Sequence, residues 1–282
     1  MNAATLIVSY NTREDLRACL RSLLASGAPP ASIYVADNAS TDGSFEMLLQ
    51  EFPQVHSVRN RRNLLYAEAM NRLLAVSRSD WVLLLNPDVI CHYDELVLLC
   101  ESWQPDTKCA AVAPQFRYFD GRIQPSCRRL PDALEPWREA WGRLLRRSSV
   151  WKMGDFDHRS ARTVEQPMFS CIWIRRSVLS VVGDLDPRYP LFFNDVDWCC
   201  RALAKGYEIQ FDPSVAVLHK HGGTTNLYPI RKLYQSNRSF ARHIWTSSET
   251  RPVQVCGLLG LGLSFVLRLP MALRRSVRRA VY

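Results

Sequence analysis

Residues 79–89 have the sequence Ser-Asp-Trp-Val-Leu-Leu-Leu-Asn-Pro-Asp-Val, and this stretch decides the fold. The run from Trp81 to Leu85 is apolar throughout, which predicts a strand buried on both faces in the middle of a parallel sheet. Because Pro87 cannot donate a hydrogen bond to a neighbouring strand, we expect the strand to end at Asn86. Asp88 would then lie just past the carboxyl end of a central strand, where open α/β sheets bind ligands. Asn-Pro-Asp is also typical of a plain turn that ends a strand.

The chain before this strand alternates between strand and helix patterns. Short apolar or β-branched runs predict strands at 5–8, 33–36 and 55–58, and apolar residues at helical spacing predict helices at 13–26, 44–51 and 63–76. This β-α-β-α order implies a parallel sheet with right-handed crossovers. The loops that follow the strands are therefore expected to line one edge of the sheet.

Acidic side chains follow two of the predicted strands at that edge. Asp37 and Asp42 come after the second strand, and Asp88 comes after the strand at 81–85. An acid at the end of the second strand commonly hydrogen-bonds the ribose or base of a nucleotide, and no Gly-x-Gly-x-x-Gly motif indicates a dinucleotide cofactor. Asp88, with the Asn86 oxygen two residues earlier, is suited to hold Mg²⁺ or Mn²⁺ against a diphosphate.

Composition limits the class of protein. The chain has 282 residues, 47% of them hydrophobic, and a net charge of +9, which favours anionic partners such as phosphorylated substrates, anionic lipid or nucleic acid. Its nine cysteines form no Cys-x-x-Cys pair, which argues against a zinc ribbon and favours reduced, buried thiols in a cytoplasmic protein. The N-terminus shows no secretory signal pattern.

Several motifs occur together in a recognisable order. They are Val8-Ser-Tyr-Asn11, Asp37-Asn-Ala-Ser-Thr-Asp42, 63–71, Leu85-Asn-Pro-Asp88, 182–188, 192–201 and 215–224. The first four resemble the nucleotide-sugar half of glycosyltransferase family 2, especially its rhamnosyltransferase-type members. The last three resemble the acceptor-side block and the closing histidine motif of that family.

The resemblance implies a fold and a domain organisation. The implied fold is the GT-A type, an α/β domain in which helices flank a Rossmann-like mixed central sheet. We expect this domain to cover residues 1–245, with a nucleotide-sugar-binding half at about 1–115 and an acceptor-binding half at 116–245. Residues 246–282 form an apolar and basic segment that is expected to associate with a membrane.

The resemblance also implies an inverting, metal-dependent sugar transfer and assigns roles to residues. We expect Asp195 to act as the catalytic base, with Asp197 as the alternative, although both acids also suit the start of a helix. Asp88 and His219 are the expected ligands of Mg²⁺ or Mn²⁺. The expected donor-binding residues are Ser9, Asn11, Asp37, Asp42, Asn63, Asn86 and Asp88. The residues expected on the acceptor or phosphate side are His221, Arg201 and Arg238.

This sequence departs from the family pattern at several places. Leu65 and Leu73 stand where the family usually has glycines, so the backbone near the donor diphosphate is expected to differ. Asn194 stands where a glutamate usually precedes the base, Asp195. Removing a like-charged neighbour lowers the pKa of a carboxyl group, so we expect this exchange to lower the pKa of Asp195.

Two segments carry apolar and basic residues together. The region 132–151 holds Trp137 and Trp141 one helical turn apart among several arginines, which is typical of a membrane-surface helix and equally of a helix packed on the sheet. Residues 253–267 are almost wholly apolar, and arginines follow them. Fifteen residues are few for a membrane span, so an interfacial or re-entrant anchor on an anionic membrane is expected.

The favoured function is an inverting glycosyltransferase on the inner face of the cell membrane. We expect it to move L-rhamnose from dTDP-rhamnose to a polyprenyl-diphosphate-linked or other saccharide acceptor in cell-surface polysaccharide synthesis. The alternatives are a nucleotidyltransferase of similar sheet architecture, a processive polysaccharide synthase, and a non-catalytic basic protein that binds nucleic acid or membranes. No nucleic-acid-binding motif is present, so nucleic acid is not an expected partner.

Overall fold

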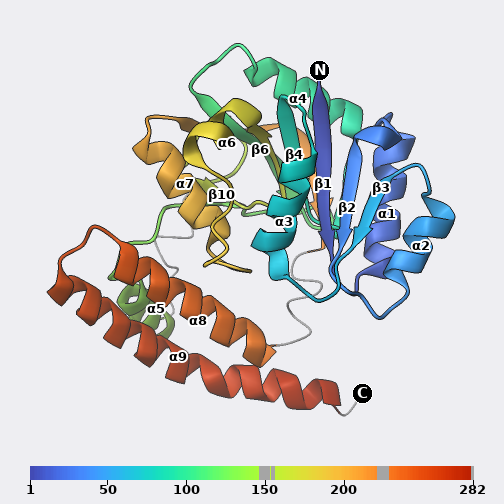
Figure 1. Cartoon of the computed structure of the whole chain (residues 1–282). Helices are drawn as coiled ribbons and strands as arrows, with labels where there is room; N and C mark the ends of the chain where they lie inside the picture. Colours follow the sequence, from blue (N-terminus) through green and yellow to red (C-terminus); the bar gives the residue numbers. More distant parts are fainter. Residues whose placement is uncertain (146–152, 154–155, 221–228, 281–282) are drawn as a thin grey trace.

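The structure is a computed structural model that describes residues 1–145, 153, 156–220 and 229–280. A mixed sheet lies at its centre (Figure 1). Across the sheet, the strands are β3 (His56–Arg59), β2 (Ile33–Asp37), β1 (Ala3–Ser9), β4 (Trp81–Leu85), β11 (Cys171–Arg175), β6 (Cys109–Arg117), β12 (Glu208–His219) and β5 (Val89–Ile90). Short β7 (Ile123–Gln124) pairs with β6 and β9 (Arg162–Thr163) with β12, while β8 (Cys127–Arg128) and β10 (Gln166–Pro167) form a separate ribbon.

The central strand predicted from the sequence is β4. All five of its residues are buried, as the unbroken apolar run predicted. It runs parallel to β1 on one side but antiparallel to β11 on the other, so the sheet is mixed, as the GT-A type requires. The strand ends at Leu85, one residue earlier than predicted, because the chain turns at Asn86, whose carbonyl accepts a 3.3 Å hydrogen bond from the Val89 amide.

Helices cover both faces of the sheet (Figure 1). On one face, α1 (Arg13–Ala25), α2 (Ser44–Glu51) and α4 (Tyr93–Trp103) bury their apolar stripes. On the other face lie α3 (Leu65–Val76), α6 (Arg176–Val182) and α7 (Asn194–Ala204). The first three helices and four strands begin and end within two residues of the predicted positions, because their local apolar spacing matches their burial.

The strand order places a topological switch point beside β1. From β1 the chain moves to β2 and β3 on one side, and it then crosses back to β4 on the other side. The loops after β1 and β4 therefore leave the sheet in opposite directions, which opens a ligand-binding position at their carboxyl ends. The sequence motifs around Asn11, Asp37 and Asp88 all lie at this edge.

A helical layer lies below the carboxyl edge of the parallel strands (Figure 1). It contains α5 (Glu135–Leu144), α8 (Pro229–Thr246) and α9 (Arg251–Ala280). Its own apolar core joins Phe240 and Ile244 of α8 and Leu261 of α9 to Phe193 and Val196 at the start of α7. Helix α9 continues past Arg268 and Pro270, so the apolar segment and the basic segment form one helix of 30 residues.

Candidate active site

Asp88 and His219 come together at the carboxyl edge, although they are far apart in the sequence. The short strand β5 pairs with the end of β12, with Val89 opposite His219, and the Lys220 amide donates to the Asp88 carbonyl at 3.1 Å. This pairing fastens the loop after β4 to the end of β12. As a result, Nε2 of His219 lies 3.5 Å from Oδ1 of Asp88.

The His219 ring is held by a buried amide. Its Nδ1 lies 2.7 Å from Oε1 of Gln124, and its ring meets Phe116 edge-on. With the proton on Nδ1 donated to Gln124, the Nε2 lone pair faces the Asp88 carboxylate. Two electron-pair donors that converge in this way fit a divalent cation, and a second hydrogen-bonding group that fixes the ring is typical of metal-binding histidines.

The donor set is small. Within the described residues, no group of three or more His, Cys, Asp or Glu side chains is arranged to hold a metal ion. Asp88 and His219 alone leave most coordination positions to other oxygen atoms. Mg²⁺ and related ions are often bound in this way, by one or two protein groups together with substrate phosphates. The chemistry of the pair therefore fits the expected Mg²⁺ or Mn²⁺.

Asp37 is fully buried at the end of β2. Its Oδ2 accepts the Ser40 amide at 3.1 Å and lies 3.8 Å from Nε of Arg59. Its Oδ1 has no hydrogen-bond partner among the described residues. A buried carboxylate oxygen without a donor is unfavourable. The arrangement therefore provides an acceptor for an N–H or O–H group of a bound molecule.

Other predicted donor-side residues organise the two loops beside Asp37. The Asn11 amide donates to Oγ of Ser40 at 2.9 Å, and its side chain accepts the Thr41 amide at 2.8 Å. Ser9 is buried and shares a 2.8 Å hydrogen bond with Thr12. These contacts tie the loop after β1 to the loop after β2, so both present a fixed surface at the switch point.

Asp42 joins the starts of two helices. One oxygen accepts the Arg13 amide at 2.9 Å at the start of α1, and the other accepts the Ser44 amide at 3.0 Å at the start of α2. Burial opposes ionisation, but the hydrogen bonds from Ser44 and Arg13 prevail and lower the pKa of Asp42. Carboxylates are also favourable at helix N-termini.

The segment where leucine replaces glycine keeps a glycine-like backbone. Leu65 has φ +64, in the left-handed region that favours glycine. Asn38 holds this segment, since its amide donates to the Leu65 carbonyl at 3.0 Å and its oxygen accepts the Leu64 amide at 3.2 Å. Asn63 accepts the Leu65 amide at 2.8 Å. Side-chain hydrogen bonds therefore hold a conformation that costs a non-glycine residue about 1–2 kcal/mol.

Asp195 lies in the first turn of α7 and is half-buried. Nε2 of Gln166, on β10, donates to Oδ2 of Asp195 at 2.8 Å. Burial raises the pKa of Asp195 above its usual range, although the charge of Arg128 opposes the shift. This effect of burial outweighs any lowering of the Asp195 pKa that results from having asparagine instead of glutamate at position 194. A base whose pKa is raised toward neutrality is better suited to proton transfer.

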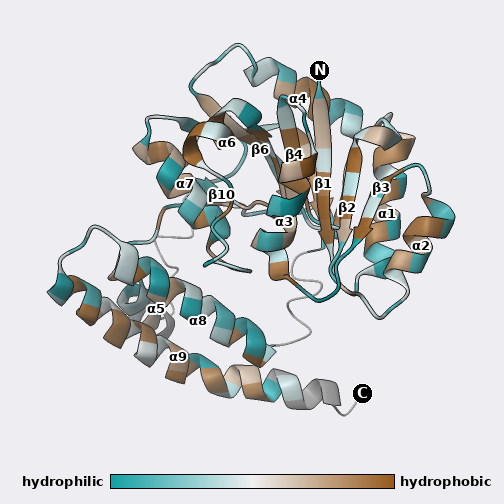
Figure 2. Cartoon of the chain, in the orientation of Figure 1, coloured by the Kyte–Doolittle hydropathy of each residue, from teal (hydrophilic) through white to brown (hydrophobic). Residues whose placement is uncertain are grey.

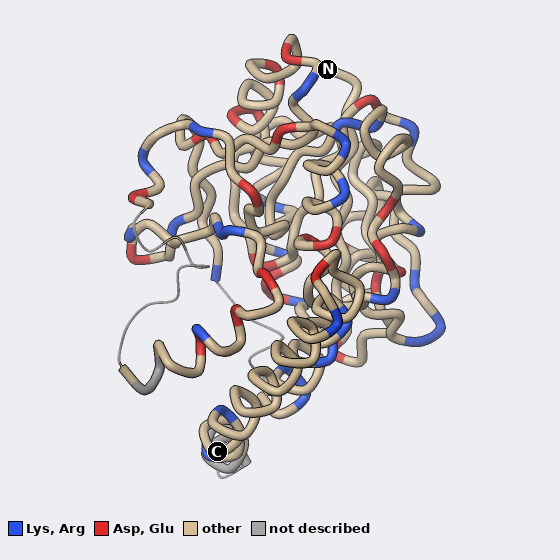
Figure 3. The backbone as a smooth tube through the Cα atoms, turned by 90° about the vertical axis from the view of Figure 1, so that its left-hand side faces the viewer, with Lys and Arg blue, Asp and Glu red and all other residues tan. Residues whose placement is uncertain are grey.

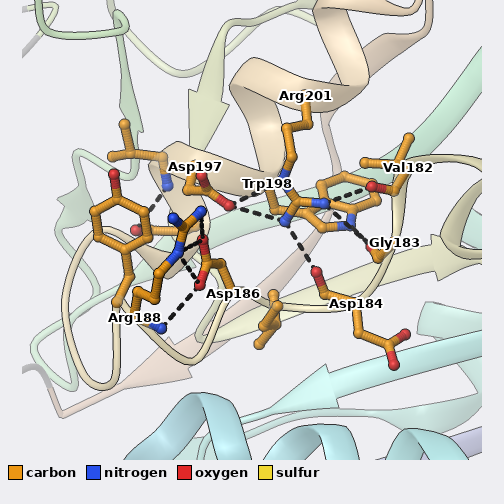
Figure 4. Close-up of polar contacts among 12 residues, drawn as sticks. Val182, Gly183, Asp184, Asp186, Arg188, Asp197, Trp198 and Arg201 are labelled. Carbon is orange, nitrogen blue, oxygen red and sulfur yellow. Dashed lines mark hydrogen bonds and ion pairs between the residues drawn. The ribbon is translucent and has the colours of Figure 1, made fainter. Parts of the chain in front are cut away.

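Asp197 has a different environment (Figure 4). The Arg201 guanidinium binds it at 2.8–2.9 Å and also donates to the backbone carbonyls of Val182 and Asp184 at 2.6 and 2.9 Å. Burial raises the pKa of Asp197, and the charge of Arg201 counteracts this. Arg201 therefore fastens α7 to the turn after α6, and Asp197 is its counter-ion.

Three of the predicted residues remain to be placed: Asn86, Arg238 and His221. The Asn86 amide donates to Oγ of Ser170 at 3.1 Å, which links the β4 end to the loop before β11. Arg238 is exposed on α8. His221 lies outside the described residues. Burial, and then the negative charge of Asp195, raise the pKa of Tyr66 above its usual range.

The comparison with protein families decides the classification. The sequence model described as Glycosyl transferase family 2 matches residues 5–182 of the chain. The chain belongs to glycosyl transferase family 2. The protein is therefore a glycosyltransferase, and the family assignment decides against a nucleotidyltransferase and against a non-catalytic binding protein.

One relative of this glycosyltransferase matches along nearly its whole length. It is the N-acetylglucosaminyl-diphospho-decaprenol L-rhamnosyltransferase of Mycobacterium tuberculosis (strain CDC 1551 / Oshkosh). The two sequences are 29% identical over 294 residues, which cover 96% of this chain and 94% of the relative. The resemblance to rhamnosyltransferase-type members that the motifs suggested is thereby confirmed.

Solved structures confirm the GT-A fold. The mannosyltransferase PcManGT from Pyrobaculum calidifontis, in complex with GDP-Man and Mn²⁺, has a TM-score of 0.58 at 16% identity, with 98% of this chain and 73% of that chain covered. The Staphylococcus aureus TarS fragment 1–349 has a TM-score of 0.55 at 13% identity, with 93% and 70% covered. At these identities the likeness concerns the fold alone.

Sequence reasoning missed three residues that the glycosyltransferase uses to arrange its site. Gln124 positions His219, Gln166 positions Asp195, and Asn38 holds the Leu65 backbone. The two glutamines lie on strands of only two residues, where no periodicity exists to indicate burial. Asn38 follows Asp37 in a cluster of turn residues, so its sequence context suggested only a turn.

Proposed function

We propose that this glycosyltransferase moves a sugar from a nucleotide-diphosphate donor to a hydroxyl group of a lipid-linked saccharide, with inversion at the anomeric carbon. The observation that carries the proposal is the convergence of Asp88 and His219, 3.5 Å apart, at the switch point of the sheet. The long match to a rhamnosyltransferase supports L-rhamnose as the sugar. The free cysteines, eight of the nine buried or half-buried, support a cytoplasmic location.

The donor nucleotide is proposed to bind beside Asp37. Oδ1 of Asp37, which has no hydrogen-bond partner among the described residues, would accept a hydrogen bond from the base. Thymine and uracil carry an N–H group at position 3, whereas cytosine has a lone pair there and would face the carboxylate unfavourably. A preference for a base with an N–H group at position 3 supports dTDP-rhamnose as the donor. Asn11 and Asp42 contribute by fixing the loops on either side.

Asp88 and His219 are proposed to hold Mg²⁺ or Mn²⁺. When bound, the ion neutralises the charge that develops on the diphosphate leaving group. Asp88 supplies a hard carboxylate oxygen, and Gln124 keeps the His219 ring turned toward it. Asn86 holds the strand end beside Asp88 through Ser170.

Asp195 is proposed to act as the base for the acceptor hydroxyl. As the acceptor oxygen bonds to the anomeric carbon, its proton passes to an Asp195 oxygen and the diphosphate departs from the opposite face of the sugar. Gln166 fixes one oxygen of Asp195 and thereby directs the carboxylate. Asp197 is a poorer candidate because Arg201 already pairs with it.

The acceptor is proposed to be a saccharide linked to a polyprenyl diphosphate. The support is the acceptor in the name of the mycobacterial relative, a diphospho-decaprenol carrying N-acetylglucosamine. Arg238, which is exposed on α8, is proposed to contact this diphosphate. His221 was predicted for the same side.

The test is a transfer assay with a panel of nucleotide sugars and a short-chain N-acetylglucosaminyl diphosphate lipid. We expect dTDP-L-rhamnose to be the preferred donor, and NMR of the product to show the anomeric configuration opposite to that of the donor. Asp195→Asn is the matched control, because it should bind the donor normally and transfer nothing. Retention of configuration, or equal use of a CDP-sugar, would contradict the proposal.

A further inference from the structure

The outer face of α9 is an exposed apolar stripe. Val255, Leu259, Leu263 and Val266 are spaced by four, four and three residues, which places them along one side of a helix. Leu259 is 66% exposed and Val266 is 63% exposed. Helix α9 forms the edge of the molecule farthest from the sheet, and hydrophobic residues predominate in its middle part (Figure 2). We call these four residues the α9 stripe.

The opposite face of α9 is docked closely on α5. A Cβ atom added at Gly257 would lie 2.1 Å from the Ala133 carbonyl oxygen, and one added at Gly260 would lie 2.5 Å from the Trp137 ring. The Trp137 indole also donates to the Cys256 carbonyl at 2.8 Å. The absence of a side chain at Gly257 and Gly260 therefore permits this close contact.

The inner face of α9 is also anchored to α8 and the loop after it. Buried Gln254 donates to the Ser247 carbonyl at 2.9 Å, and Leu261 packs with Phe240 and Ile244. Residues Arg251–Arg274 are long and apolar enough to cross a membrane by length and composition. A crossing helix would leave these contacts and expose the core of the helical layer, so the docked arrangement favours a helix that lies flat.

The charge of this segment matches an anionic lipid surface. Residues 251–282 contain six arginines and no acidic residue. Basic residues also occur along the described end of α9 (Figure 3). A second copy packed on the same stripe would bring arginines against arginines, whereas phospholipid headgroups with negative charge would neutralise them.

We propose that the α9 stripe is a membrane-docking face, which inserts into the headgroup and acyl boundary of an anionic bilayer with the helix axis in the plane of the membrane. Apolar insertion and arginine attraction act together, as two signals are needed for stable attachment. The carboxyl edge of the parallel strands faces the same helical layer (Figure 1). An acceptor that remains anchored in the bilayer would therefore approach the site from the docked side.

The test is flotation with vesicles of phosphatidylglycerol and phosphatidylcholine, compared with phosphatidylcholine alone. We expect the full chain to float with the anionic vesicles and to detach at high salt. The double variant Leu259→Gln/Val266→Gln should lower the partition coefficient by at least about tenfold, because two side chains lose their apolar insertion. Deleting α9 would be a poorer test, since it would strip the core around Phe240 and Ile244.

The matched control is Val76→Gln/Leu98→Gln on α3 and α4. These two residues are 61% and 66% exposed, so the control removes similar apolar surface away from α9. The control should float like the unchanged chain. Both double variants should transfer sugar normally to a short, water-soluble acceptor. If the unchanged protein itself transfers no sugar to that acceptor, the result refutes the proposed function and not the docking proposal.

Three results would overturn the docking proposal. The first is that the α9 double variant floats as well as the unchanged chain. The second is a concentration-dependent dimer that the double variant abolishes without any flotation of the unchanged chain, because the stripe would then bind a second copy. The third is resistance to extraction by alkaline carbonate, which would indicate a spanning helix.

Discussion

Replacing Gln166 by alanine should move the pH dependence of the reaction. Gln166 is fully buried and donates its amide to Asp195 at 2.8 Å. A hydrogen bond to a carboxylate stabilises the ionised form and lowers the pKa. Its removal therefore raises the pKa of Asp195 further above its usual range, where burial has already placed it.

The size of the shift follows from the strength of the lost contact. Hydrogen bonds to charged groups contribute about 1.5–3 kcal/mol. One pKa unit corresponds to about 1.4 kcal/mol, so the pKa of Asp195 should rise by about 1–2 units. We expect a shift near the lower end of this range, because Asp195 is only half-buried and water can replace part of the lost bond.

The assay is kcat/KM for sugar transfer as a function of pH. A general base must be ionised, so activity falls as the pH drops through its pKa. In Gln166→Ala this acid limb should lie about one pH unit higher than in the unchanged enzyme. At pH values well above the limb, the two enzymes should differ much less.

A buried glutamine elsewhere provides the control. Nε2 of Gln115 donates to the His158 carbonyl at 2.7 Å, and its Oε1 has no hydrogen-bond partner in the part of the chain that the structure describes. Gln115→Ala should lower the melting temperature without moving the acid limb. If Gln166→Ala lowers kcat/KM by the same factor at every pH, with the limb unmoved, Asp195 is not the titrating base and the reasoning fails.

Three further predictions concern the metal site, the choice of base and the stability. Asp88→Asn should lower kcat/KM roughly 100-fold while leaving the melting temperature unchanged, and activity that survives EDTA would argue against a metal. Asp197→Asn should retain at least a tenth of the activity but melt at a lower temperature, because it weakens the contact with Arg201. An inactive Asp197→Asn variant together with an active Asp195→Asn variant would show that Asp197 is the catalytic base. Nε2 of His158 accepts two backbone amides, and burial lowers the pKa of His158. The unfolded state therefore binds more protons, and stability is lost as the pH falls below about 6.5. His158→Gln should flatten the fall of the melting temperature between pH 7 and 5, and an unchanged slope would contradict this.

Much of the sheet could be predicted from sequence because its determinants are local. The run from Trp81 to Leu85 is apolar at every position, and only a strand covered on both faces accommodates that pattern. The positions of Asp37 and Asp88 followed directly, since each comes where a predicted strand ends. The antiparallel insertion of β11 between β4 and β6 was not predictable, because it depends on pairing between segments more than sixty residues apart.

The candidate site shows the same division. Its acids were identified as candidates from their motifs, and the family resemblance favoured Asp195 over Asp197, but the sequence showed no physical difference between their surroundings. The structure separates them because Gln166 reaches Asp195 from 29 positions away, while Arg201 pairs with Asp197 within one helix. Likewise, Gln124 meets His219 across 95 positions. Such partners depend on how strands and helices are packed, which local patterns do not encode.

The C-terminal helix shows most plainly what each level decides. Its apolar and basic composition, on which the proposed affinity for an anionic surface rests, is a property of the sequence alone. The tertiary structure decides which face of α9 is exposed. The face with Gly257 and Gly260 packs closely against the Ala133 carbonyl and the Trp137 ring, whereas Leu259 and Val266 remain exposed on the other face. A glycine weakens an isolated helix, but it removes the side chain that would keep two helices apart.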